Sequence, residues 1–492
     1  MVDPWLIGGW PLRTVRLDQT TSRLARRDRF VVGDPASARF ARTLIELGVA
    51  TPIVRSGRTG IAVTVVVPVR DDAAGLDRLL RSVRDTPVIV VDDASAIPVR
   101  VDVDVHPSVT VIRLPVNRGP GAARVVGARA AGTPLVAFLD SDVVAEAGWL
   151  DHLLPHFDDP LVDIVAPRVL ADTGSDGVVA RYDAATSSLD RGDRLCRVAP
   201  HTAVTFVPGA AMVVRSTWAT AWDEDLRIGE DVDLCWRVVA AGRAVQFVPT
   251  ARVRHQHRRT GLLGVLRRRH QYGTGTCGLA RRHRAAGAPI ELTPLTAAVL
   301  LAATGLPWHI RAAAGVIGLA TDHRHHRRLV AQTPVASAVA TRVVARAAPH
   351  ALRHLASLAV RVYAPVAVAV AVVSPVSRRW AAVAIAADLV LRTRDAVTPA
   401  SHGAGKRAVD VVAFPVIGLL DDLAYCAGVW SGAVRARSVA GLLPTVRPRA
   451  RTAQVAGAVN IPTTSRWNAS RSSGPARSRS SSLTRYHSAA SS

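Results

Sequence analysis

The stretch 136-VAFLDSDVVAEAGWL-150 places two carboxylates, Asp140 and Asp142, directly after a run of four apolar residues. The run is typical of a strand buried on both faces, and the segment after Asp142 favours a helix. Two acids one residue apart at the end of such a strand repel each other and lose hydration. A hard divalent cation compensates both, because alternate carboxylates on a turn can converge on one ion while phosphate oxygens and water complete its shell. The stretch therefore predicts a metal site at a strand end, although a lone D-x-D motif is a weak signal.

The residues around this stretch repeat a strand–helix pattern from Ile61 to about Arg284. The β-branched runs 61-IAVTVVVPV-69 and 87-PVIVVDDAS-95 indicate further buried strands. Alternating units of this kind predict an α/β fold, Rossmann-like, with a mostly parallel sheet and helices on both sides. Ligands of such sheets bind beyond the carboxyl ends of the strands. Four acids are predicted to lie at that edge: Asp92, Asp93, Asp140 and Asp142.

Composition divides the chain into four parts. Residues 1–59 predict a small α+β module similar to a winged helix, in which a helix is closed by Gly48. Residues 60–290 form the α/β domain. Residues 291–445 are rich in Ala, Val and Leu and predict hydrophobic helices. Residues 446–492 are rich in Ser and Arg, contain no acid, and are predicted to be disordered.

The hydrophobic part contains the apolar segments 292-LTPLTAAVLLAATGLPW-308 and 362-VYAPVAVAVAVVSPV-376, joined through the basic connector 322-DHRHHRRLVAQ-332. Each segment is shorter than the roughly 20 residues that a spanning helix needs. An ordinary helical domain and hydrophobic helices at the cytoplasmic face of a membrane both fit this pattern. We favour membrane association, either peripheral or integral at the inner face.

The charge and the cysteines restrict the partners and the compartment. The formal net charge of +24 suits a phosphate-rich ligand, an anionic membrane or nucleic acid. Nucleic acid is disfavoured, because aromatic residues are scarce among the arginines and no nucleic-acid-binding motif is present. The four scattered cysteines argue against a zinc ribbon and a disulfide framework. Without a secretory signal pattern at the start, this usage predicts a cytoplasmic location.

Six segments resemble, in the right order, the landmarks of the family 2 glycosyltransferases, enzymes of the A-type nucleotide-sugar fold. They are 65-VVVPVRDDAAGLDRLLRSV-83, 88-VIVVDDAS-95, 117-NRGPGAARVVGARAA-131, 136-VAFLDSD-142, 206-FVPGAAMVVRSTW-218 and the segment from 229-GEDVDLCWRV-238 to 251-ARVRHQH-257. The resemblance covers roughly residues 61–284 and implies that residues 60–290 are a catalytic domain acting on a nucleotide-sugar donor.

The resemblance implies a set of nucleotide-binding residues. Asp93 would accept the imide N–H of uracil, and Asp72 would approach the ribose or base, although Asp72 also fits a helix N-cap. Basic residues of 267-RRRHQYG-273 would contact the diphosphate. The complete predicted set is Pro68, Asp72, Asp93, Arg124, Asp140, Arg267 and Arg268.

The resemblance also implies the metal ligands. In the family the last acid of D-x-D meets the metal most directly, so Asp142 is the first ligand and Asp140 supports it. His255, or else His257, would complete the shell of a Mn²⁺ or Mg²⁺ ion.

The catalytic residues are expected in the segment 229-GED-231. An inverting transfer needs a general base that removes the proton of the acceptor hydroxyl as its oxygen attacks the sugar. Asp231 matches the family's base position, and Glu230 would orient the acceptor or the loop. A plain helix start is the alternative, since acids suit the first helical turn.

The order of the parts most resembles the glycosyltransferases of mycofactocin systems. That resemblance implies transfer of β-1,4-linked glucose from UDP-glucose to mycofactocin or its precursor, a peptide-derived redox cofactor. The N-terminal module would then recognise a peptide by strand addition. A membrane glycosyltransferase of cell-envelope polysaccharide or lipid-linked sugar is the alternative. A nucleotidyltransferase is disfavoured, because 68-PVRDDAAG-75 lacks the expected lysine in a Gly-rich loop.

Overall fold

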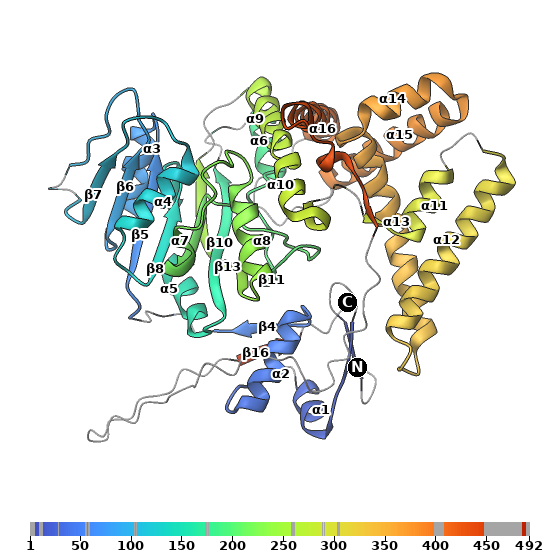
Figure 1. Ribbon diagram of the computed structural model, residues 1–492, viewed down its shortest axis with the longest axis horizontal. Helices are drawn as coiled ribbons and strands as arrows, with labels where there is room; N and C mark the ends of the chain where they lie inside the picture. The colour runs from blue at the N-terminus through green and yellow to red at the C-terminus, as the bar shows by residue number, and fades with distance from the viewer. Residues whose placement is uncertain are drawn as a thin grey trace. The chain divides into compact units, whose positions relative to one another are not determined.

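The computed structural model of the chain forms two compact units (Figure 1). One unit comprises residues 1–55, 323–343 and 448–492, and the other comprises residues 56–322 and 344–447. The structure describes residues 5–8, 13–27, 29–54, 57, 60–102, 104, 106–172, 175, 177–256, 261–287, 289, 291–302, 306–397, 408–446 and 485–488.

The first unit contains the N-terminal α+β module. Its elements are β1 (Trp5–Gly8), β2 (Arg13–Arg16), α1 (Gln19–Ala25), β3 (Arg29–Val31), α2 (Pro35–Glu46), β4 (Ala50–Ile53) and β16 (Arg485–Ser488). Phe40 and Leu44 on α2 pack with Phe30 in its core, and Gly48 follows the helix at φ +69°. β16 pairs antiparallel with both β3 and β4. Apart from Val446 and β16, the tail predicted to be disordered lies outside the described residues.

The second unit is built on a nine-stranded sheet. Its path is β11 (Cys196–Val198), β13 (Ala244–Gln256), β10 (Val162–Asp172), β12 (Ala211–Arg215), β8 (Leu135–Leu139), β5 (Val63–Val69), β6 (Val88–Asp92) and β7 (Val109–Arg113), and β9 (Val143–Ala145) pairs with β13. The strands β5 to β8 run parallel, whereas β12 is antiparallel to both of its neighbours, β8 and β10. The predicted α/β fold with a mostly parallel central sheet is confirmed.

Alternate residues of the central strands face two separate cores. Val65 and Val67 of β5 pack with α3 (Ala73–Ser82) and α5 (Trp149–Leu153), whereas Val66 packs with α4 (Pro120–Ala130) and α8 (Glu230–Ala240). This period of two explains why β5 and β8 read as continuous apolar runs, since both faces of each strand are buried. The remaining helical elements are η1 (Leu154–Asp158), α6 (Val178–Ala185), α7 (Ser216–Ala219), α9 (Leu262–Thr274), α10 (Thr276–His283) and η2 (Arg284–Gly287).

The C-terminal part is helical. It contains β14 (Glu291–Leu292), α11 (Pro294–Ala302), α12 (Trp308–Leu329), α13 (Ala336–Arg361), α14 (Ala364–Val373), α15 (Pro375–Val397), α16 (Ala408–Arg435), η3 (Ala440–Leu442) and β15 (Thr445–Val446). Among the described residues, α16 alone is long and apolar enough to cross a membrane, and 39% of its most apolar window is buried. The last turns of α13 pass the same criterion together with α14, as a pair bent by 97°.

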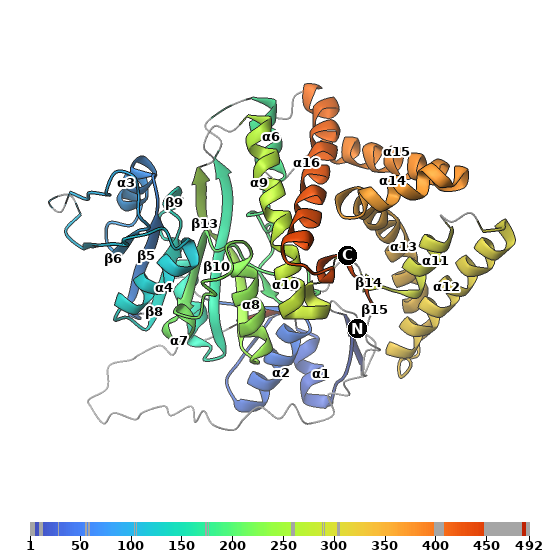
Figure 2. The same cartoon turned by 45° about the horizontal axis from the view of Figure 1, so that its top comes forward.

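Helices α9 and α16 cross at very short range (Figure 2). A Cβ added at Gly428 would collide with the carbonyl oxygen of His270, and one added at Gly273 would collide with that of Tyr425. A Cβ at Gly432 would lie 2.6 Å from the carbonyl oxygen of Thr274. Only glycine therefore permits this approach, which holds α9 against α16.

Replacing Gly428 by valine is expected to lower the stability by about 3 kcal/mol, because the side chain meets backbone that cannot rotate away. The apparent Tm of the second unit should fall by about 4 °C, because an unfolding entropy of about 2.1 cal/mol/K per residue is large for a unit of this size, and a thermal scan measures the shift. The matched control is Gly315→Ala on α12, where an added Cβ meets nothing within 4 Å. Equal Tm values for the two variants would contradict the close crossing.

Candidate active site

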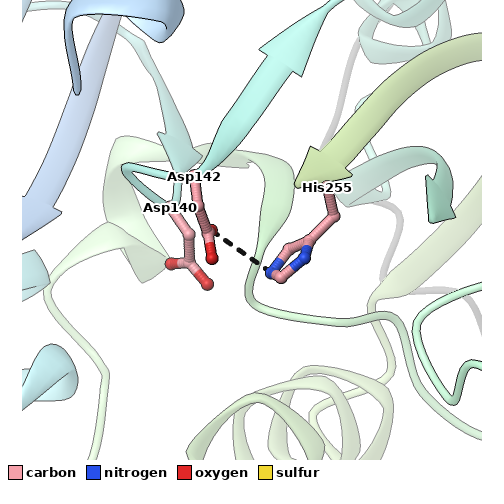
Figure 3. Close-up of side chains that lie close together, drawn as sticks. All are labelled: Asp140, Asp142 and His255. Atoms are coloured by element: carbon pink, nitrogen blue, oxygen red, sulfur yellow. Dashed lines mark ion pairs between the residues drawn. The ribbon is translucent and has the colours of Figure 1, made fainter. Parts of the chain in front are cut away.

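Three side chains come together beyond the end of β8. Single ligand atoms of Asp140, Asp142 and His255 all lie within 4.8 Å of one another, and each residue is half-buried. Figure 3 shows both carboxylates emerging from the same turn, with the His255 ring at the end of β13 facing Asp142. His255 Nε2 lies 3.2 Å from Asp142 Oδ1. The structure thus brings together the three predicted metal ligands, whereas His257 lies outside the described residues.

The backbone fixes this geometry. Asp140 donates its N–H to the carbonyl of Ala210 at 3.0 Å, which anchors the turn to the start of β12. β9 then runs antiparallel to β13, with His255 opposite Val143. Gln256 donates its N–H to the carbonyl of Asp142 at 2.8 Å, so the pairing extends to the acid itself. His255 is therefore placed by sheet register and not by a chance loop contact.

The donor set suits a divalent cation. Two carboxylates and one imidazole supply oxygen and nitrogen ligands, and they leave positions for the phosphate oxygens of a substrate. Ser141 between the acids donates its hydroxyl to Asp72 Oδ2 at 2.9 Å, which turns it away from the metal position. The residues present therefore fit an ion such as Mn²⁺ or Mg²⁺.

Arg124 on α4 connects the metal cluster to the predicted catalytic pair. Its Nη2 donates to Asp140 Oδ1 at 2.7 Å and its Nη1 donates to Glu230 Oε1 at 3.0 Å. The guanidinium stacks on the Trp222 ring, 4.6 Å from its centroid, and only 3% of the side chain is exposed. Burial acts to lower the pKa of Arg124, but the charges of Asp140 and Glu230 raise it above its usual range. A direct contact of Arg124 with a nucleotide would have to replace one of these ion pairs.

Glu230 and Asp231 begin α8, directly after Gly229 at φ +83°. Burial, together with the charge of Asp231, raises the pKa of Glu230 to about 7, although the ion pair with Arg124 opposes this. Asp231 accepts the N–H of Gly209 at 2.9 Å and that of Val232 at 2.8 Å. Burial raises the pKa of Asp231, and these two hydrogen bonds act to lower it. The two acids thus lie at the start of a helix, and both have raised pKa values beside the metal cluster.

The predicted nucleotide-binding acids have local partners. Asp93 is buried, and its two oxygens accept the N–H groups of Arg118 at 2.7 Å and Gly119 at 2.8 Å. Asp72 caps α3 by accepting the N–H of Gly75 at 3.3 Å, so its N-cap role is confirmed. Each carboxylate oxygen can accept a further bond, and the roles of both acids towards a nucleotide stay predictions.

Pro68 lies inside β5, one residue before the strand ends at Val69. Its missing N–H costs nothing towards β8, because the pairing of β5 with β8 ends at Val66. Pro68 is therefore compatible with a central strand at this one position. Its contact with a nucleotide stays a prediction.

The predicted diphosphate-binding arginines lie on α9. Arg268 pairs with Asp183 at 2.7 Å, whereas Arg267 is exposed. Arg269 pairs with Asp421 of α16 at 2.8 Å. The triplet thus joins α9 to two other helices, and the contact of Arg267 and Arg268 with a diphosphate stays a prediction.

Sequence reasoning missed Arg191, which lies in the irregular segment before β11. Its Nε donates to the carbonyl of Phe206 at 3.2 Å, and its guanidinium lies 4.2 Å from the centroid of the Phe206 ring. Burial lowers the pKa of Arg191, and Asp231 is the foremost charge that opposes this. No periodicity or motif marks this arginine, because its place depends on the loop conformation.

Comparisons with known proteins agree with this geometry. The model of the family described as "Glycosyl transferase family 2" matches residues 64–219. The chain is 41% identical over 454 residues to the "Pre-mycofactocin glycosyltransferase" of Mycobacterium tuberculosis (strain CDC 1551 / Oshkosh), covering 90% of this chain and 94% of the relative. It is 23% identical over 224 residues to the "Polypeptide N-acetylgalactosaminyltransferase 4" of Caenorhabditis elegans, covering 40% of this chain and 36% of the relative.

Among solved structures, the mannosyltransferase PcManGT from Pyrobaculum calidifontis in complex with GDP-Man and Mn²⁺ aligns with a TM-score of 0.40 at 16% identity, covering 80% of this chain and 94% of that chain. The identity to the mycobacterial relative extends over nearly its whole length. The chain therefore belongs to the family 2 glycosyltransferases, and within them to the glycosyltransferases of the mycofactocin pathway.

Proposed function

We propose that the chain is a metal-dependent, inverting hexosyltransferase that moves glucose from UDP-glucose, in β-1,4 linkage, to mycofactocin or its peptide-derived precursor. The observation that carries the metal-dependent mechanism is a pair of ion pairs, from Asp140 of the metal cluster to Arg124 and from Arg124 to Glu230, which lies next to Asp231. These ion pairs connect the proposed metal site, which would hold the leaving diphosphate, to the proposed base, which would activate the acceptor. The acceptor is inferred from the long match to the mycobacterial relative.

The proposed reaction uses Asp231 as the general base. Its carboxylate takes the proton of the acceptor hydroxyl while that oxygen forms a bond to C1 of the sugar from the face opposite the diphosphate. The bond between C1 and the diphosphate oxygen breaks, and UDP leaves with the electron pair. A divalent ion held by Asp140, Asp142 and His255 would supply charge stabilisation for that diphosphate. Glu230 and Arg124 hold the carboxylates of Asp231 and Asp140 in position relative to each other.

Placement of the enzyme in the cell is part of the proposal: a cytoplasmic location with association at the inner face of the membrane. The length of α16 would also suit the alternative, a membrane glycosyltransferase of envelope or lipid-linked sugars. Its carboxylates favour a packed helix instead. Asp410 pairs with Arg181 at 2.5 Å and Asp421 pairs with Arg269 at 2.8 Å, both within the second unit. A charge that is paired in a protein core would be costly in lipid.

Mass spectrometry tests the donor and the acceptor together. The full chain with Mn²⁺ is incubated with UDP-glucose, UDP-N-acetylglucosamine or GDP-mannose, and with the mycofactocin precursor or a lipid extract as acceptor. We expect successive hexose increments on the precursor with UDP-glucose alone. Increments only on lipid would move the assignment to the alternative, and increments only with GDP-mannose would refute uridine recognition at Asp93.

A further inference from the structure

Helix α14 exposes an unusual apolar surface. Its ten residues, Ala364–Val373, are all alanine, proline or valine. None of them is buried, and five valines are 44–79% exposed: Val366, Val368, Val370, Val372 and Val373. A soluble helix normally turns one polar face to water, whereas this helix offers apolar side chains on all sides. Contact with water is therefore unfavourable over its whole length.

The apolar surface continues onto α15. Within the second unit the two helices pack against each other, joined at Ser374 (Figure 2), and we call residues 364–393 the α14–α15 hairpin. Four large apolar residues of its second helix are 41–66% exposed: Trp380, Val383, Ile385 and Val390. Two helices in contact thus both expose large apolar residues, and exposed apolar surface of this extent marks an interaction site in soluble proteins.

Among the described side chains of residues 364–393, the charges at the surface have one sign. Arg378 and Arg379 are exposed at the start of α15, next to Trp380. The acid of the hairpin, Asp388, is buried and pairs with Arg392 at 2.6 Å. The described surface of the hairpin thus combines valines, a tryptophan and two cations. This combination complements an anionic bilayer, because tryptophan prefers the headgroup level and arginine binds acidic lipids.

The base of the hairpin is fixed to the rest of the second unit. Arg361, just before α14, pairs with Asp422 of α16 at 2.5 Å and stacks 4.1 Å from the centroid of the Tyr425 ring. Tyr363 donates its hydroxyl to the carbonyl of Leu442 at 2.8 Å. The valines of α14 therefore project from an anchored base. A helix of ten residues spans about 15 Å, half of the hydrocarbon core, so it can enter one leaflet but cannot cross the bilayer.

We propose that the α14–α15 hairpin is a monotopic anchor that inserts the valines of α14 into one leaflet of an anionic membrane, with Arg378 and Arg379 at the headgroups. This proposal rests on the proposed membrane association. It adds which helices bind the membrane and which lipid headgroups they prefer. It would hold the catalytic unit at the membrane without a spanning helix. A soluble acceptor could then be glycosylated at the surface of the inner leaflet.

Sedimentation with vesicles tests the anchor in the full chain. Wild-type protein should bind vesicles of phosphatidylcholine and phosphatidylglycerol more tightly than pure phosphatidylcholine, and Arg378 with Arg379 should account for about 25-fold of this preference, at about fivefold for each arginine. Arg378→Glu with Arg379→Glu should lower the preference at least about 25-fold, while the remaining net positive charge of the chain keeps its own attraction. Val368→Asp with Val372→Asp should weaken binding to both vesicles at least about 10-fold, since apolar burial drives insertion. The matched control is Ile97→Asp, at an exposed apolar residue of the α/β domain that is 83% accessible.

Two further measurements separate the possible failures. Hydrogen exchange of wild-type protein should show slower exchange of the α14 amides when anionic vesicles are added, a result that needs no variant. Glucose transfer to a soluble acceptor without vesicles should be equal in all hairpin variants, so loss of the anchor and loss of the proposed function remain distinguishable. Unchanged vesicle binding by the aspartate variant, or a protein dimer in wild type that this variant dissociates, would overturn the proposal. In the latter case a second copy of the chain covers the valines.

Discussion

Asp231→Asn is expected to fold and to bind UDP-glucose as the wild type does, yet to transfer glucose about 10²- to 10⁴-fold more slowly. The amide is nearly isosteric, and its carbonyl oxygen keeps one of the two hydrogen bonds that Asp231 accepts from Gly209 and Val232. It cannot accept the proton of the acceptor hydroxyl. Single-turnover kinetics and calorimetry on the same preparation measure transfer and donor binding separately.

The pH dependence gives this prediction a second readout. A general base works only when it is ionised, and the pKa values of the adjacent acids are raised, that of Glu230 to about 7. The value of kcat/KM should therefore fall as the pH drops below neutrality, on an acid limb that belongs to the coupled pair. Glu230→Gln removes one of the two negative charges, so it should move this limb to lower pH while part of the transfer activity remains. Full activity in Asp231→Asn would eliminate Asp231 as the base.

The sequence predicted the central strands well, because β5 and β8 are buried on both faces and therefore read as unbroken apolar runs. It also predicted Asp140 and Asp142 together, since strand-end acids meet at one edge of a parallel sheet, and the family resemblance added His255. The structure places ligand atoms of all three within 4.8 Å of one another, and their role as metal ligands stays a prediction. The family motif predicted the catalytic pair, Glu230 and Asp231. Only the structure shows that Arg124 connects this pair to the metal cluster.

What the sequence could not predict depends on contacts between distant segments. The antiparallel insertion of β12 between β8 and β10 leaves no trace in composition, because a strand buried on both faces looks alike in either direction. Arg268 was expected to face a diphosphate, yet its pairing with Asp183 spans 85 residues of chain. Arg124 was predicted to contact the nucleotide, and only its partners explain why a buried cation is tolerated. Ion pairs of this kind have no local signature.

Asp142→Ala is expected to abolish the dependence of donor binding on the metal. In the wild type, Mn²⁺ should raise the apparent Tm, since an ion at 100 times its Kd stabilises the folded protein by about 2.7 kcal/mol. In the variant this rise should disappear. The stability without metal should change by less than about 1 kcal/mol, because the lost contact with His255 is offset by relief of the repulsion from Asp140.

The control for this prediction is Asp77→Ala, which removes an exposed acid of α3 whose partner is Arg81 at 2.7 Å. It should leave both the Tm rise with Mn²⁺ and the calorimetric affinity for UDP-glucose unchanged. A Tm rise that persists in Asp142→Ala would place the ion elsewhere. Two acids next to each other at a strand end would then lack the compensation that their repulsion demands, although the pairing of β9 with β13 holds His255 beside Asp142.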